Sequence, residues 1–112
     1  MMIVVEKREF VTVVSIDGSV DGTTARELVS SFREQVSGGS ARLVGNLAGV
    51  DYTSSAGLRA LLETVKESRL RGGDLRLAAV RPEVLRVLEL SGFTSILQVF
   101  SDVETAVASF AA

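Results

Sequence analysis

The chain of 112 residues contains no cysteine and no histidine. The lack of cysteine excludes disulfides and thiol nucleophiles, and the lack of both excludes zinc sites built from these two ligands. Without histidine there is no Ser-His-Asp triad, and the commonest general base near neutral pH is missing. The glycine-rich segment 37–42 also lacks the Gly-Lys-Ser/Thr sequence of a phosphate-binding P-loop. We therefore expect a protein that is not an enzyme and holds no metal and no cofactor.

Aromatic residues are sparse as well, and the chain carries no excess of basic residues. There are five Phe, one Tyr and no Trp, and the net charge is −2. Because nucleic acid is held by basic surface, this composition argues against a nucleic-acid partner. The apolar run near the N-terminus is too short for a signal-peptide core or a membrane span. We expect no membrane insertion and a cytoplasmic location.

The apolar content of 46% is ample for one core, and its periodicity predicts the order ββαβαβαβα. Strands alternating with helices predict an α/β fold with a mostly parallel sheet of about five strands and about four helices. The first two strands form an antiparallel hairpin at its edge, and residues 1–112 make one domain. The expected strands lie at residues 2–5, 10–16, 43–47, 75–79 and 96–100, and the expected helices begin near residues 23, 54, 82 and 102.

One stretch, Asp51 to Arg59, connects the expected third strand to the expected central helix. Apolar residues 43–50 precede it, and a helical apolar stripe follows it at Leu58, Leu61, Leu62 and Val65. Its three hydroxyls, Thr53, Ser54 and Ser55, therefore fall at the start of a helix, where backbone N–H groups have no internal partner.

Two interpretations of these hydroxyls remain open from their spacing. One hydroxyl can serve as an N-cap, which is a common way to begin a helix. Alternatively, one is a phosphoacceptor, since a helix N-terminus stabilises phosphate. Gly57, in the first helical turn, leaves room for another backbone to approach.

Two further residues are candidates for the rim of this site. Asp21 lies in a turn before the first helix, which Thr23 or Thr24 is expected to cap, and is either a surface turn residue or part of the rim. Asn46 is polar within the third strand. It is either a hydrogen-bonded turn residue or a neighbour of the hydroxyls, because open α/β sheets place their sites at the carboxyl ends of strands.

With these motifs the sequence resembles a STAS domain over nearly its whole length, and most closely the bacterial anti-sigma factor antagonists. The resemblance is carried by the order of elements and by three motifs: Asp-x-Thr-Ser-Ser-Ala-Gly-Leu-Arg at 51–59, Gly-Ser-Val-Asp at 18–21 and Gly-Gly-x-Leu-x-Leu at 72–77. It implies a partner that is both an anti-sigma factor and a serine kinase. The unmodified antagonist binds this partner and frees a sigma factor. Phosphorylation ends the binding, and a metal-dependent serine phosphatase reverses it.

The resemblance also implies the acceptor. Family members carry it one or two places before the motif glycine, and Ala56 has no hydroxyl, so Ser55 is the first choice, Ser54 the second and Thr53 a distant third. Two family aspartates, which would stand beside the acceptor, fall at Ser54 and Asn46 in this chain. The expected partner-binding residues are Asp21, Asn46, Asp51, Thr53, Ser54, Gly57 and Arg59.

The two missing carboxylates motivate an alternative within the same family. The chain would then be a non-switching STAS adaptor, such as a subunit of a lipid-transport or signalling scaffold complex. The two functions differ in their response to a negative charge at Ser55, because only the switched antagonist depends on it.

Overall fold

The computed structural model describes residues 1–111. Its elements follow the predicted order, with one short 3₁₀ helix added before the last strand. They are β1 (Met2–Lys7), β2 (Thr12–Asp17), α1 (Thr24–Ser37), β3 (Arg42–Gly49), α2 (Ser55–Leu70), β4 (Asp74–Ala78), α3 (Pro82–Leu90), η1 (Phe93–Ser95), β5 (Val99–Phe100) and α4 (Val103–Ala108).

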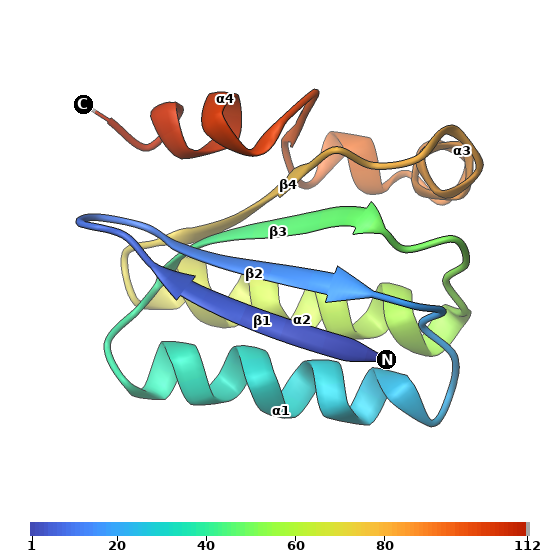
Figure 1. The fold of residues 1–112 in the computed structure, drawn as a ribbon, viewed down its shortest axis with the longest axis horizontal. Helices are drawn as coiled ribbons and strands as arrows, with labels where there is room; N and C mark the ends of the chain where they lie inside the picture. Colours follow the sequence, from blue (N-terminus) through green and yellow to red (C-terminus); the bar gives the residue numbers. More distant parts are fainter. Residues whose placement is uncertain (112) are drawn as a thin grey trace.

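The five strands form one sheet in the order β1-β2-β3-β4-β5 (Figure 1). Strand β1 runs antiparallel to β2, and every other neighbouring pair is parallel. This confirms the predicted mixed sheet with an antiparallel hairpin at its edge. Because β2, β3 and β4 are parallel, their carboxyl ends point the same way, and the loops that follow β2 and β3 meet at one end of the molecule.

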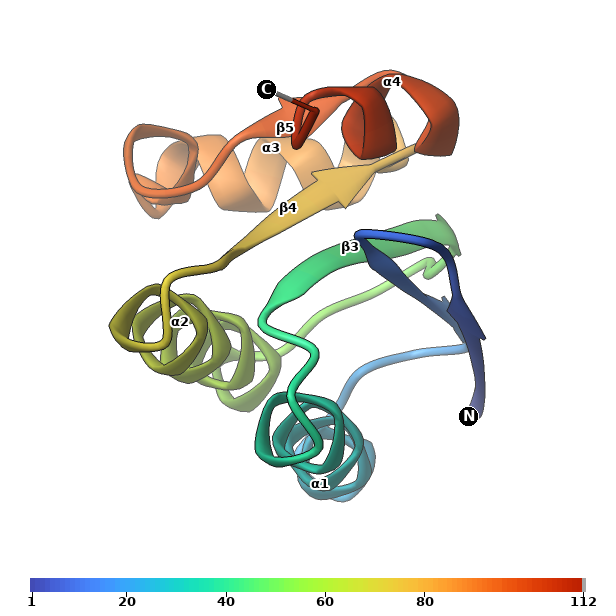
Figure 2. The same cartoon turned by 90° about the vertical axis from the view of Figure 1, so that its left-hand side faces the viewer.

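Helices cover the sheet on both faces. The larger core cluster joins one face of the sheet to α1, α2 and α3, while α4 packs on the other face through Ala106 (Figure 2). Strand β2 contributes to both clusters, Val14 to the larger and Val13 to the smaller. Both side chains are buried, as expected for a strand covered on two faces.

All five strands differ from the prediction at one end or both, and β2 begins at Thr12 and not at residue 10. Glu6 and Lys7 belong to β1 and not to the turn, which closes through a hydrogen bond from the Arg8 N–H to the Val11 carbonyl at 2.8 Å. The last strand is shorter than residues 96–100, because Gly92, with φ of 77°, leads into η1 and only Val99 and Phe100 pair with β4.

Helix α4 is held to the sheet by two arginines. The Arg76 guanidinium stacks 4.0 Å from the centre of the Phe110 ring and donates to the Ser109 carbonyl at 2.7 Å. Arg8, beside the β1–β2 turn, forms an ion pair with Glu104 at 2.7 Å. These contacts keep α4 away from the end of the sheet where the three hydroxyls lie. No helix in residues 1–111 combines the length and apolar character needed to cross a bilayer.

Candidate functional site at the start of helix α2

The loops that follow β2 and β3 are joined by backbone hydrogen bonds. The Val20 N–H donates to the Tyr52 carbonyl at 2.9 Å, and the Ser54 N–H donates to the Val20 carbonyl at 2.8 Å. The Ser19 hydroxyl adds a bond to Asp51 Oδ1 at 2.8 Å. These contacts fix the start of α2 beside the start of α1 at one end of the molecule (Figure 1).

Ser54 is the N-cap of α2. Its backbone is extended, and its Oγ accepts a hydrogen bond from the Gly57 N–H at 3.3 Å. Its carbonyl accepts the first helical bond, from the Leu58 N–H at 3.0 Å. The capping interpretation of the hydroxyls therefore holds for Ser54, whose oxygen is already engaged.

Thr53 and Gly57 form an internal contact beneath this cap. The Thr53 hydroxyl is half-buried and donates to the Ser54 carbonyl at 3.3 Å. A Cβ added at Gly57 would collide with Thr53 Oγ1 and lie 2.8 Å from Val20 Cγ1. Gly57 thus makes room for two side chains of its own domain and not for the backbone of a partner. Gly57 is buried in the unbound chain, and its predicted contact with a partner stays a prediction.

Ser55 differs from both neighbours. It is the first residue of α2 and is exposed, and among the hydrogen bonds of the described residues none involves its hydroxyl. Ala56, next to it, packs against the large core cluster. Of the three hydroxyls, only that of Ser55 is both exposed and unbonded.

The backbone at the start of α2 favours a negative charge. The N–H groups of Ser55 and Ala56 precede the first helical hydrogen bond, and the first turn of α2 contains no acidic residue. The positive end of the helix dipole is therefore uncompensated by a carboxylate of its own turn. A phosphate on Ser55 would be stabilised there.

Asp21 lies at the start of the neighbouring helix and caps it. Its Oδ1 accepts hydrogen bonds from the N–H groups of Thr23 and Thr24, both at 2.9 Å. These bonds stabilise the charged form and lower the pKa of the Asp21 carboxyl, with the bond from Thr24 the largest cause. Thr23 occupies the N-cap position of α1, as predicted, but its side chain makes no capping hydrogen bond, and the Asp21 carboxylate accepts from these N–H groups instead. Asp21 remains exposed at the rim.

Asn46 is not beside the hydroxyls. Its Nδ2 donates to Ser15 Oγ at 3.1 Å, and its Oδ1 accepts from the Ala48 N–H at 3.1 Å. Side chains alternate along β3, and Val44, two residues earlier, packs in the cluster of α4. Asn46 therefore points to the face of the sheet opposite α2. The rim interpretation is wrong for its side chain, and the hydrogen-bonded interpretation is correct.

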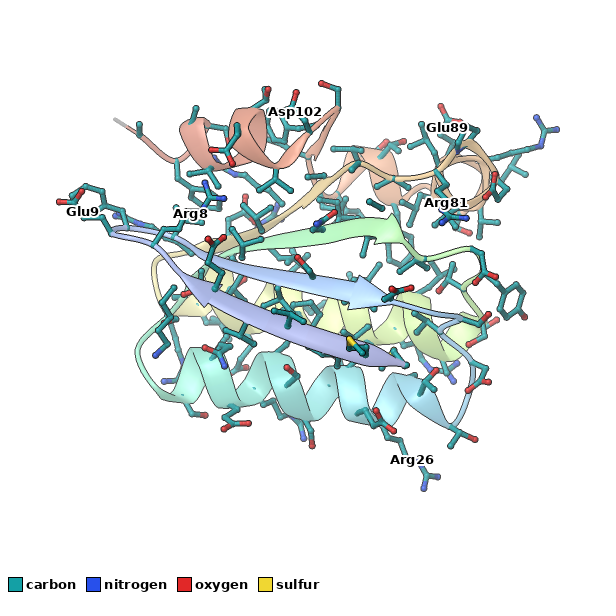
Figure 3. The ribbon with its side chains drawn as sticks, in the orientation of Figure 1. Arg8, Glu9, Arg26, Arg81, Glu89 and Asp102 are labelled. Atoms are coloured by element: carbon teal, nitrogen blue, oxygen red, sulfur yellow. The ribbon has the colours of Figure 1, made fainter. Side chains whose placement is uncertain are left out.

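Asp51 and Arg59 are exposed, and their contact with a partner stays a prediction. Two other residues at this end were not among the predicted contacts. Tyr52 is 54% exposed although it is the only tyrosine of the chain, and Arg81 donates through Nε to the Ala48 carbonyl at 2.8 Å at the end of β3 (Figure 3). The signal for Tyr52 was a large aromatic residue within a polar loop.

The acidic residues of residues 1–111 do not gather into a group of three that could hold a metal ion. Asp21 and Asp51 are instead engaged in separate hydrogen bonds, to the start of α1 and to Ser19. The chemistry available at this end is therefore that of an exposed hydroxyl at a helix start, within a surface that carries charged and aromatic side chains.

Comparisons with known proteins show the family of the chain. The STAS domain model matches residues 2–106. The chain belongs to the STAS domain family. A protein named as the anti-sigma factor antagonist BtrV, from Bordetella bronchiseptica, is 36% identical over 110 residues, which cover 98% of this chain and 95% of BtrV.

Solved structures show the same fold. A Thermotoga maritima protein described as an anti-sigma factor antagonist superposes with a TM-score of 0.90 at 18% identity, covering 96% of this chain and 92% of that one. The Bacillus cell fate determinant SpoIIAA in its phosphorylated form gives a TM-score of 0.76 at 16% identity, covering 96% and 98%. At these identities the likeness establishes the fold alone.

Proposed function

We propose that this STAS protein is an anti-sigma factor antagonist that docks on an anti-sigma factor through the surface around the start of α2. The observation that carries the proposal is the exposed, unbonded hydroxyl of Ser55. It lies in a chain 36% identical to a protein named as an antagonist of this kind. Docking would release the sigma factor that the anti-sigma factor holds, in the cytoplasm.

The anti-sigma factor is, in this proposal, also a serine kinase that switches the antagonist off. Ser55 Oγ attacks the γ-phosphorus of ATP bound to the kinase, ADP leaves, and the hydroxyl proton passes to a base of the kinase. The chain has no histidine to take that proton, so Ser55 serves as a substrate and not as a catalytic nucleophile. A metal-dependent serine phosphatase returns the hydroxyl by hydrolysis.

The added phosphate acts locally. The helix N-terminus accommodates its charge, so the domain stays folded, and a protein with this fold has been solved in a phosphorylated form. At the centre of a docking surface, however, the phosphate adds bulk and a charge of about −1.5 to −2 that must be desolvated. A loss of about 3–4 kcal/mol would weaken binding several hundredfold.

The docking surface combines charged and aromatic side chains around Ser55. Asp21, Asp51, Arg59 and Tyr52 are all exposed at or beside the two joined loops. Tyr52 is suited to anchor the partner, because its backbone is fixed by Val20 while its ring is exposed. Thr53 and Ser54 support the surface from beneath.

The two missing family carboxylates do not weaken this proposal. Ser54 keeps the capping role that an aspartate could fill, since serine and aspartate are comparable N-caps. Asn46 lies on the opposite face of the sheet, where its side chain bonds Ser15. Neither substitution therefore changes the group that would accept phosphate.

The proposal is tested by reconstituting the exchange. The chain is added to a complex of a kinase-type anti-sigma factor and its sigma factor from the same genome, and free sigma factor is measured by size-exclusion chromatography. We expect the unmodified chain to release sigma factor, and ATP to reverse the release for the wild type but not for Ser55→Ala.

The non-switching adaptor function predicts a different result. An adaptor would leave the complex intact and would copurify with a transporter or scaffold subunit, whether or not Ser55 is replaced by Asp. If the chain displaces sigma factor from none of these complexes, the antagonist proposal is overturned in favour of the adaptor.

A further inference from the structure

We infer that Arg59 is the internal counter-ion of a phosphate on Ser55, so that phosphorylation withdraws a positive charge from the docking surface as well as adding a negative one. This inference rests on the proposed function for the identity of the modified residue. It concerns the contact that the phosphate makes within the chain, which the binding of an anti-sigma factor does not specify.

The spacing of the two residues places them together. Ser55 and Arg59 are four residues apart in α2, and both are exposed. Side chains four apart on a helix are neighbours, and a helical side chain leans toward the N-terminus, so Arg59 leans toward Ser55. A phosphate one turn before an arginine also has the order, acid first and base second, that is favoured on a helix.

Arg59 is available for this contact. Among the ion pairs that the described residues form, none involves Arg59. Its other neighbour at helical spacing is Glu63, which lies one turn toward the C-terminus of α2. Glu63 Oε2 is 3.8 Å from Arg33 Nη2 of α1. The guanidinium can therefore turn to a phosphate without first breaking an ion pair.

The other charges at this end leave Arg59 as the suitable cation. Arg81 is held at the end of β3, where its Nε donates to the Ala48 carbonyl at 2.8 Å. Asp21 and Asp51 would repel a phosphate, although each is held by hydrogen bonds in its own loop. Arg26 lies at the start of α1 and points away from the body of the molecule (Figure 3). A planar guanidinium also matches phosphate oxygens in a two-point contact.

The pairing has a consequence for regulation. In the unmodified chain Arg59 can meet an acidic group of the anti-sigma factor. In the modified chain the same guanidinium is neutralised by the phosphate four residues away. One covalent change then alters two positions of the docking surface.

The test uses the full chain with phosphoserine incorporated at position 55 by genetic encoding, so no kinase is needed. Phosphorus NMR measures the second pKa of the phosphate, which is about 6 without neighbours. We expect Arg59→Gln to raise this pKa by about 0.15–0.4 of a unit, because a nearby cation favours the dianion. The matched control Arg26→Gln removes the same charge from the other helix and should leave the pKa unchanged within about 0.1 of a unit.

Equal shifts in the two variants, or no shift in either, would overturn the pairing. A second measurement follows the Arg59 Nε–H resonance, which should move when Ser55 is phosphorylated and stay in place when it is not. Either result is independent of the proposed function, because the phosphate is introduced without a partner. Conversely, a chain that shows the pairing but releases no sigma factor would refute the antagonist function alone.

Discussion

Helices α1 and α2 begin side by side at the carboxyl end of the sheet, and short polar residues surround both starts. At α1 a carboxylate fills the helix end, since Asp21 accepts from two N–H groups and Glu27 lies in the first turn. At α2 the cap is the neutral Ser54, and the first turn has no acid. If Ser55 is the phosphoacceptor as proposed, the difference teaches that the uncompensated helix start is the one that receives the added negative charge.

The largest expected effect is on the affinity for the anti-sigma factor when a carboxylate is introduced at the start of α2, compared with the start of α1. Ser55→Asp should weaken binding to the anti-sigma factor several hundredfold, because a charge then stands in the docking surface. Thr23→Asp, at the start of α1, should cost less than about tenfold, a loss of under 1.4 kcal/mol. Isothermal titration calorimetry of both variants measures the contrast, and equal losses would remove the distinction between the two helices.

The glycines at the starts of α1 and α2 should differ in how much stability is lost when each is replaced by alanine. Gly57→Ala should lower the free energy of unfolding by about 1–3 kcal/mol, because its Cβ overlaps Thr53 and Val20. Gly22→Ala, before α1, meets nothing within 4 Å and should change stability by less than about 0.5 kcal/mol. Urea unfolding followed by circular dichroism compares them. A stable Gly57→Ala protein would contradict the internal role assigned to this glycine.

Alanine substitutions at the two adjacent serines, Ser54 and Ser55, should also differ in their effect on the free energy of unfolding. Ser54→Ala removes the N-cap of α2 and should cost about 1 kcal/mol of unfolding free energy. Ser55→Ala removes a hydroxyl without a bonded partner and should cost less than about 0.5 kcal/mol. The same urea experiment distinguishes them, and a reversed order would mean that Ser55, not Ser54, holds the helix.

The smallest effect concerns pH at the start of α1. The pKa of Asp21 is lowered in the folded chain, so its carboxylate stabilises the fold above the unfolded pKa, near 3.8, and this contribution is lost as pH falls through the lower folded value. Asp21→Asn should therefore lower the Tm at pH 7, and its deficit should shrink as the pH drops below about 3.8. A deficit that persists unchanged into strong acid would show that the charge is not responsible.

Most of the fold followed from the sequence because its signals are local. Apolar periodicity located β2, β3 and α2, and the alternation of strands and helices gave a mostly parallel sheet. The last strand could not be located correctly, since its length depends on the turn at Gly92 and on pairing with β4.

The site was predicted less completely, because it depends on which face and which oxygen each side chain uses. The sequence placed three hydroxyls at a helix start, but only the structure separates the cap, Ser54, from the exposed Ser55. Asn46 was misplaced because the pleat of β3 turns it to the other face. Tyr52 was missed because its exposure depends on the pairing of two loops.

The most direct test of the central claim, that Ser54 holds the helix while Ser55 meets the partner, is to map the phosphate. The chain is incubated with ATP and a kinase-type anti-sigma factor from the same genome, and tandem mass spectrometry locates the modified residue in the wild type, Ser54→Ala and Ser55→Ala. We predict phosphate on Ser55 in the first two proteins and none in the third. Phosphate on Ser54 or Thr53 of the wild type, or transfer to Ser55→Ala, would contradict the claim.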